Sequence, residues 1–492
     1  MAWLLLRSGT KPSRLTYPCQ QSAFSLATAA FGGPIVIAVL AGRTTLLRIL
    51  RTPMGALSGG MLGMLLLFIG AVASLEPSSG VALQAPPADY HPQIFLVNDA
   101  RGPTLDGFGG VDDLLTLMGN SGLKWHRSTQ IRVTSGPDGL IGSDDVVLIK
   151  INGQWTQRGG TNTDVLRGVI RRIVEHPDGF TGEVVVADNT QNYSNLDRAE
   201  NNAEDTSQSP QDVVDDFATE GWHVSTSLWD SFRGRSAGEY ADGDPIDGYV
   251  VSAGRDPQTD ILVSYPKFRS AFGTYISYKR GVWSPSAGTY EPDRLVVINI
   301  PVLKTHSIYG VTASVKNHMG VVTTALSTDS HYGVARGGLG SLLSEVRMPD
   351  LNILDCIWIL ARPGLGPSAA YTSATRCDKL VASRDPVALD IWAVKNVLSP
   401  QVIANGYTAE QYGFRLDPDD PTSIFRAYLD KSMSEMLAAG IDATNDYRAV
   451  ALHTFRSADT IPTVSHWGLM VTALLLLTTG TLVLTRRSAI RL

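Results

Sequence analysis

Five side chains that can carry charge or direct a proton lie within one short segment of the chain, between Ile298 and Gly320. They are Lys304, His306, Lys316, Asn317 and His318. Lysines can hold a carboxylate or a phosphate, histidine titrates near neutral pH and can act as an acid or base, and asparagine can orient a carbonyl or hydroxyl group. We therefore expect an anion-binding or catalytic site in this segment.

The same segment begins as an apolar strand, and Pro301 interrupts it. Proline cannot donate to a strand ladder, so we expect the strand to end there. The chain would then turn over the rim of a sheet with Lys304 and His306 in the turn. Residues 310–320 would return as a short helix or an irregular turn and carry Lys316 and Asn317.

The middle of the chain alternates between β-branched apolar runs and segments of helical period. The predicted strands are 144–152, 182–189, 293–301, 351–360 and 378–384, and the predicted helices begin at 163, 338 and 386. Thr163 can cap the first helix, and Asp385 followed by Pro386 fits the start of another. Strand–helix–strand units at this spacing predict an α/β domain with a mostly parallel sheet and flanking helices. We expect 195–220 to be an inserted loop and 254–283 to form a hairpin or an edge strand.

In open α/β sheets the ligand crevice lies beyond the carboxyl ends of the strands. Lys150 and Asn152 end one predicted strand, and Asp188 ends the next. Several lysines held close together would repel one another unless an anion or a carboxylate balanced them. We therefore expect one crevice that binds a small anionic ligand. Its candidate catalytic residues are Lys304, His306, Lys316 and His331, and its candidate binding residues are Lys150, Asn152, Asp188, Asn317 and Asp385.

Several of these segments together resemble the family called domain of unknown function 362. The resemblance is carried by 298–320, His331, "LNILDCIW", "GPS" at 366–368 and "LVASRDPVALD", and it extends over roughly 144–398. It implies an α/β domain and the same lysine, histidine and asparagine positions, but it implies no particular reaction. Many relatives carry ferredoxin-like cysteine clusters. This chain has three cysteines without such spacing, so we expect no iron–sulfur cluster. Cys356 and Cys377 could pair in an exported protein, but Cys356 lies inside an apolar run, which favours two separate buried thiols.

Both ends of the chain carry membrane signals. A basic stretch, an apolar run and Ala71-Val72-Ala73 match a secretory signal or, alternatively, an uncleaved anchor. At the other end, 467–484 is free of charge and would span about 27 Å as a helix. With Ile461-Pro462-Thr463-Val464 before it and arginines after it, this tail resembles an IPTL-CTERM sorting signal, a relative of PEP-CTERM. The resemblance implies export and processing or anchoring by an exosortase-like enzyme; the alternative is a plain membrane anchor.

These patterns divide the chain into five segments. They are a leader (1–73), an N-terminal extension (74–143), the α/β domain (144–400), a helical extension and linker (401–460), and the sorting signal with its transmembrane helix and basic tail (461–492). The net charge of -6, without a basic stripe, argues against nucleic acid as a partner.

Two other functions remain open besides a site for a small anion. A metal-binding or redox-linked protein could use His306, His318 and His331 with Asp188 as an oxygen ligand, although no closely spaced histidine pair supports a metal site. A non-catalytic surface protein would suit the sorting tail, but the chain has no repeats or low-complexity stalk. The crowding of ionisable groups past strand ends favours a binding or catalytic role.

Overall fold

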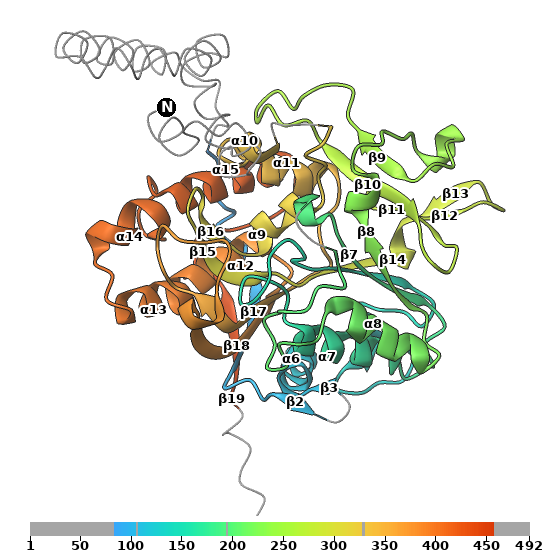
Figure 1. Ribbon diagram of the computed structural model, residues 1–492, viewed down its shortest axis with the longest axis horizontal. Helices are drawn as coiled ribbons and strands as arrows, with labels where there is room; N and C mark the ends of the chain where they lie inside the picture. The colour runs from blue at the N-terminus through green and yellow to red at the C-terminus, as the bar shows by residue number, and fades with distance from the viewer. Residues whose placement is uncertain (1–82, 105–106, 193–194, 327–329, 457–492) are drawn as a thin grey trace, which may run out of the picture.

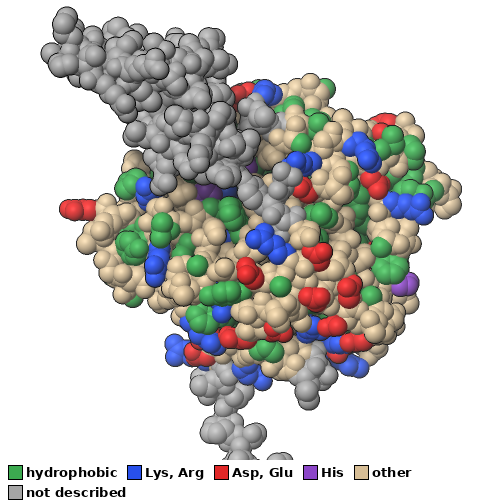
Figure 2. Space-filling view, viewed as in Figure 1, with side chains coloured by type: hydrophobic (Ala, Val, Ile, Leu, Met, Phe, Trp, Pro, Cys, Tyr) green, Lys and Arg blue, Asp and Glu red, His purple; other side chains and the backbone are tan. Residues whose placement is uncertain are grey.

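A computed structural model of the protein describes residues 83–104, 107–192, 195–326 and 330–456 (Figure 1). The predicted leader 1–73 and sorting tail 461–492 lie outside the described residues. No helix within the described part is long and apolar enough to cross a membrane. On the face seen in Figure 2, acidic and basic side chains are interspersed.

The core of the fold is a ten-stranded sheet. Its main path runs β19-β1-β18-β17-β14-β6-β7-β8, and β15 pairs with both β17 and β16. The strands are β1 (Gln93–Asn98), β6 (Val146–Lys150), β7 (Glu183–Asp188), β8 (Val224–Leu228), β14 (Leu295–Asn299), β15 (Val302–His306), β16 (Gly310–Thr312), β17 (Leu351–Leu360), β18 (Thr375–Ser383) and β19 (Ala451–Arg456). The block from β17 to β8 is parallel, whereas β18 is antiparallel to β17 and to β1. The expected α/β architecture of a large sheet with flanking helices is therefore confirmed, and the sheet itself is mixed.

Helices cover both faces of this sheet (Figure 1). On one face lie α6 (Gly109–Asn120), α7 (Thr163–Val174) and α8 (Pro210–Thr219), and on the other lie α9 (Ser314–Asn317), α11 (Gly338–Glu345), α12 (Pro386–Ala393) and α15 (Ile424–Ala438). Alternate residues of β6 enter the two cores, since Val147 and Ile149 face the first layer and Val146 and Leu148 the second. Burial on both faces explains why these strands are continuous apolar runs.

A second, antiparallel sheet packs against the second layer. It consists of β9 (Gly248–Val251), β10 (Ser264–Arg269), β11 (Tyr275–Ser277), β12 (Gly281–Ser284) and β13 (Thr289–Glu291), in the order β13-β12-β11-β10-β9. There are also two short strand pairs, β2 (Pro103–Thr104) with β3 (Gly107–Phe108) and β4 (His126–Arg127) with β5 (Ser135–Gly136). The remaining α-helices of the described residues are α10 (Ser330–Val334), α13 (Ser399–Ala404) and α14 (Ala409–Leu416). The aromatic span predicted as one hairpin or edge strand is thus part of a five-stranded meander.

The expected loop at 195–220 is wrong in its second half, where α8 forms. Ser209 caps this helix in a reciprocal capping box with Asp212, and Pro210 occupies its first turn. Val213 and Phe217 are buried on the same helix face. The acidic composition of the segment concealed a short amphipathic helix.

The expected turn after Pro301 is also wrong. The chain passes through 300–301 and resumes as β15 beside β17, where the Pro301 carbonyl accepts a hydrogen bond from Asp355 N over 2.9 Å. β17 is ten residues long and continues past the end of β14, so its outer half offers the chain a second length of strand to pair with. Lys304 and His306 therefore project from a strand, not from a turn.

Helix starts and chain ends differ in smaller ways. Asn162, not Thr163, caps α7 by accepting from the amides of Asp164 and Val165, whereas Asp385 caps α12 as expected. The segment 401–460 contains the predicted helices but ends in β19, which pairs in parallel with β1. Strands from the predicted segments 74–143, 144–400 and 401–460 thus belong to one sheet. Cys356 and Cys377 are both free thiols, the first buried and the second partly buried.

Candidate functional site

A pocket of about 270 Å³ lies past the carboxyl ends of β6 and β7. It is enclosed by the loops that follow these strands, the β15–β16 hairpin, α9, α10 and residues 366–368. Six of the nine candidate site residues line it: Asn152, Asp188, His306, Lys316, Asn317 and His331. The volume is close to the lower end of the range for small-molecule sites. The structure thus brings these six residues together at the edge where the sequence predicts a shared crevice, whereas Lys150, Lys304 and Asp385 do not line the pocket.

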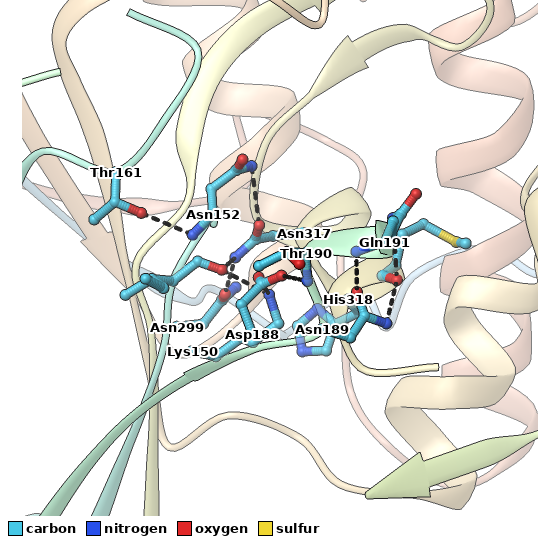
Figure 3. A network of polar contacts seen from close by, with 12 residues as sticks. Lys150, Asn152, Thr161, Asp188, Asn189, Thr190, Gln191, Asn299, Asn317 and His318 are labelled. Carbon is cyan, nitrogen blue, oxygen red and sulfur yellow. Dashed lines mark hydrogen bonds and ion pairs between the residues drawn. The ribbon is translucent and has the colours of Figure 1, made fainter. Parts of the chain in front are cut away.

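Lys150 and Asp188 form an ion pair beneath the pocket (Figure 3). The Lys150 Nζ lies 2.6 Å from Asp188 Oδ2 and also donates to the Ile151 carbonyl over 2.7 Å. Both side chains are buried, and Asp188 Oδ1 accepts from the Thr190 amide over 2.5 Å. Burial lowers the pKa of Lys150, and the neighbouring carboxylate opposes that effect. Lys150 itself does not line the pocket, so it supports Asp188 from below.

A chain of asparagine side chains connects the sheet to α9 (Figure 3). Asn152 Nδ2 donates to Asn317 Oδ1 over 3.1 Å, and Asn317 Nδ2 donates to Asn299 Oδ1 over 2.8 Å. Asn299 Nδ2 in turn donates to Asn352 Oδ1 over 2.9 Å. All four are buried, so each amide is held in one orientation. The network fixes the Asn152 and Asn317 side chains at the pocket wall.

Lys304 is fully buried behind this wall and does not line the pocket. Its Nζ donates to the Gly159 carbonyl and, over 3.4 Å, to Asn152 Oδ1. Burial, together with the nearby Lys316, holds the pKa of Lys304 well below its usual value. The structure therefore places Lys304 among the groups that hold the loop after β6.

Two histidines face the pocket. His306 Nδ1 accepts hydrogen bonds from the backbone amides of Ile308 (3.0 Å) and Tyr309 (3.2 Å), which leaves its proton on Nε2 in the neutral ring. Burial and the adjacent Lys316 hold the pKa of His306 well below its usual value. Burial also lowers the pKa of His331 to about 3. Both rings are therefore neutral at neutral pH and can donate or accept hydrogen bonds without adding charge.

Lys316 is the only lysine or arginine among the described residues that line the pocket. Its side chain lies over the Tyr309 ring, with Nζ 5.1 Å from the ring centroid, and has no hydrogen-bond or ion-pair partner among the described residues. The residue is only 7% exposed, and burial lowers its pKa to about 7. The pocket thus contains one buried amine that is partly neutral at physiological pH.

The short helix α9 positions Lys316 and Asn317, and Asp390 of α12 holds the start of α9. The two carboxylate oxygens of Asp390 accept from the amides of Ser314 (2.7 Å) and Val315 (2.9 Å). Just after α9, Gly320 packs against the ion pair under the pocket. A Cβ at this position would lie 2.4 Å from Lys150 Nζ, so the close approach requires glycine.

Two predicted residues lie elsewhere. Asp385 caps α12 and accepts from the Thr444 amide over 3.0 Å, away from the pocket lining. His318 is buried with its Nδ1 3.1 Å from the Ser314 carbonyl and does not join His306 and His331 at the pocket. Within the described ranges, no three His, Cys, Asp or Glu side chains are placed to hold a metal ion. The metal hypothesis gains no support from this arrangement.

Sequence reasoning missed several residues of the site. The pocket lining also includes Gln154, Gln191, Tyr309 and Ser368. Asn299 and Asp390 were missed as well, although Asn299 lies in a predicted strand and Asp390 in a predicted helix. A signal existed for Asn299, since it is the last residue of its strand and pairs in register with Lys150. The role of Asp390 depends on a contact across 75 residues, which no local pattern reveals.

The fold and the pocket define an α/β protein with a small polar site past the carboxyl ends of parallel strands. Residues 293–395 match the model of the family described as Domain of unknown function (DUF362). The family resemblance expected from the sequence is confirmed over this region, which contains Lys304, His306, Lys316, Asn317, His331 and Asp390. No curated protein and no solved structure gave a match.

Proposed function

We propose that the pocket binds a small anionic compound and that Lys316 provides the positive charge opposite it. The observation that carries this proposal is the buried Lys316 ammonium at the pocket wall without a carboxylate partner among the described residues. Asp188 is the only acidic residue among the described residues of the lining, and Lys150 already pairs with it. A buried cation without a counter-ion is costly, and a bound anion removes that cost.

His306 and His331 support the proposal as hydrogen-bonding and proton-transfer groups. Neutral imidazoles beside a bound anion can donate or accept hydrogen bonds without adding charge, and can exchange a proton with another group of the site. Asn152 and Asn317, fixed by the asparagine network, offer oriented amides at the same wall. The site therefore suits a small carboxylate or phosphate that also carries a carbonyl or hydroxyl group.

Thermal unfolding of the full chain in the presence of phosphate, oxalate and other small anions tests this proposal. We expect at least one anion to raise the midpoint in the wild type and to have no effect on Lys316→Met. Lys279→Met is the matched control, since Lys279 also lies over a tyrosine ring but is exposed. An anion that stabilises Lys316→Met as strongly as the wild type would show that the charge of Lys316 is not used.

The pH dependence gives a second test. An anion favours the charged form of Lys316 and raises its pKa above the value of about 7 in the free protein. The groups around it are His306, His331 and Lys304, which are neutral or disfavoured as cations, and the paired Lys150 and Asp188. We expect the affinity to be constant below pH 7 and to fall by about tenfold per pH unit above it. Affinity that rises with pH would contradict the proposal.

We propose further that the domain is exported and retained at the cell envelope by the C-terminal tail. The support comes from the sequence. Arginines precede the N-terminal apolar run and follow the C-terminal one, and both groups are expected on the cytoplasmic side of the membrane. The tail also resembles an IPTL-CTERM signal. A reporter fused after Ser457 should be active only in its exported form, and replacement of Trp467-Gly468 should change retention without a change in domain stability. A reporter active in the cytoplasm would contradict this topology.

A further inference from the structure

Lys316 is placed as a nucleophile as well as a cation. Its Nζ has no acceptor to hold it among the described residues, and the Tyr309 ring covers one side of it. The titratable groups that interact electrostatically with Lys316 are Lys304, His306 and His331, all of which are bases. The only carboxylate among the described residues of the lining, that of Asp188, is paired with Lys150. Burial in the pocket disfavours the ammonium form of Lys316, and a neutral amine in a small pocket can attack a carbonyl carbon.

We propose that Lys316 forms an imine with a small carbonyl compound that carries an acidic group, such as a 2-oxo acid or an aldehyde acid. This inference rests on the proposed function, because it assigns a chemical class to the anion of the same pocket. The pocket volume of about 270 Å³ limits the compound to a small one. The two roles of Lys316 are compatible, since a protonated imine keeps a positive charge next to the carboxylate of such a compound.

The step balances without an oxidant or a reductant. The lone pair of Lys316 Nζ forms the C–N bond, and the π pair of the carbonyl moves to its oxygen, which takes up a proton. A proton leaves the nitrogen and a second proton joins the oxygen; water then departs with the C–O pair, and the nitrogen lone pair forms C=N. Amine, carbonyl compound and one proton thus give a protonated imine and one water.

His306 is suited to donate a hydrogen bond to the carbonyl oxygen, and the proton that this oxygen takes up comes from solvent. Two backbone amides occupy its Nδ1, so its Nε2 is the N–H donor of the ring. His331 lines the same pocket and can receive the proton that leaves the nitrogen. Asn152 and Asn317 are fixed by other side chains and line the wall on which the acidic group would lie.

Reductive trapping tests the proposal on the full chain. The protein is incubated with glyoxylate and cyanoborohydride at pH 7, and peptide mass spectrometry locates the modified lysines. We expect Lys316 to be trapped at least about tenfold faster than the exposed Lys279, because a lysine near neutrality has a much larger fraction of free amine. Oxalate, an anion without a reactive carbonyl, should protect Lys316 in the wild type. Acetaldehyde, which lacks the acidic group, should react more slowly at Lys316 than glyoxylate.

The outcomes separate the two proposals. If Lys316 reacts no faster than Lys279 while oxalate still stabilises the protein, the imine is wrong and the anion site stands. If neither effect occurs, both proposals are wrong. Lys316→Arg should retain stabilisation by oxalate and lose the trapped peptide. If this variant does not fold, the protection of Lys316 by oxalate in the wild type still tests whether the trapped lysine lies in the anion site. Equal rates for acetaldehyde and glyoxylate would overturn the assigned class of compound.

Discussion

Lys150 and Asp188 form a fully buried ion pair, 2.6 Å from Nζ to Oδ2, between the last residues of two neighbouring parallel strands. Both oxygens of this carboxylate have partners, Lys150 Nζ and the Thr190 amide, and among the described residues Asp188 forms no ion pair with Lys316. The pair therefore has two consequences: it closes the floor of the pocket, and it leaves the pocket lysine without a counter-ion. The first consequence can be measured as stability and the second as reactivity.

The ion pair should show strong coupling in a double-mutant cycle. Lys150→Met and Asp188→Asn should each cost about 3–5 kcal/mol of unfolding free energy, because each leaves one buried polar group without its partner. The double variant should cost less than the sum by about 1–3 kcal/mol. The exposed pair Arg167 and Asp216, measured in the same way by urea unfolding, should couple by less than about 1 kcal/mol. Equal coupling in the two pairs would show that burial does not strengthen the first.

Gly320 should be intolerant of even the smallest side chain. Gly320→Ala would place Cβ 2.4 Å from Lys150 Nζ and 2.7 Å from Asp188 Oδ2, so the ion pair must move. We expect a loss of about 2–4 kcal/mol in unfolding free energy. Gly413→Ala is the matched control, because a Cβ there meets no atom within 4 Å and alanine favours the helix in which it lies. A stability loss of equal size in both variants would contradict the steric explanation.

Much of this architecture could be predicted from the sequence. The apolar runs of β6, β7, β14 and β17 identified buried parallel strands, and the polar residues that end β6 and β7 located the edge where the pocket lies. Periodicity could not show that β17 outlasts β14, and this difference in length decides that Lys304 lies in a strand. Nor could it show that Lys304 points into the core while Lys316 lines the pocket. Residue type identifies a lysine as a possible ligand-binding group, but only packing decides which lysine has a partner.

Acid should destabilise the protein in part through His126. Its Nε2–H donates to the Arg172 carbonyl over 2.6 Å, and its ring packs 4.7 Å from that of His176. Burial lowers the pKa of His126 to about 4, below the value of about 6.5 in an unfolded chain. The unfolded state therefore binds more protons between these values, and stability falls as pH falls from 6.5 to 4.

The contribution of His126 is measured as a difference, because buried carboxyl groups act in the opposite direction. Burial raises the pKa of Asp355 and Asp390 to about 7, so these groups favour the folded state as pH falls below 7. The loss of unfolding free energy between pH 6.5 and 4 should be smaller in His126→Gln than in the wild type, and the difference should reach up to about 3 kcal/mol. His91→Gln at an exposed position should follow the wild-type curve. Parallel curves for His126→Gln and the wild type would contradict the assignment.

Two buried aspartates hold helix starts in similar ways, but only one of them is expected to affect the pocket. Asp390 accepts the amides of Ser314 and Val315 and thereby fixes α9, which carries Lys316. Asp385 accepts the amides of Val387 and Ala388 at the start of its own helix, away from the pocket lining. Replacement by asparagine puts an amide donor opposite a backbone donor in each case. We expect both variants to lose about 1–3 kcal/mol of unfolding free energy.

Reactivity should distinguish the two variants. In Asp390→Asn, α9 loses one of its two backbone contacts to the carboxylate, so Lys316 shifts relative to His306, and trapping by glyoxylate should slow by about tenfold. In Asp385→Asn, the trapping rate should match the wild type, since Lys316 and its neighbours keep their positions. Both rates are measured at a temperature where each variant is fully folded by circular dichroism. A slower rate in Asp385→Asn would return Asp385 to the binding site predicted from the sequence, whereas an unchanged rate in Asp390→Asn would mean that side-chain packing alone positions α9.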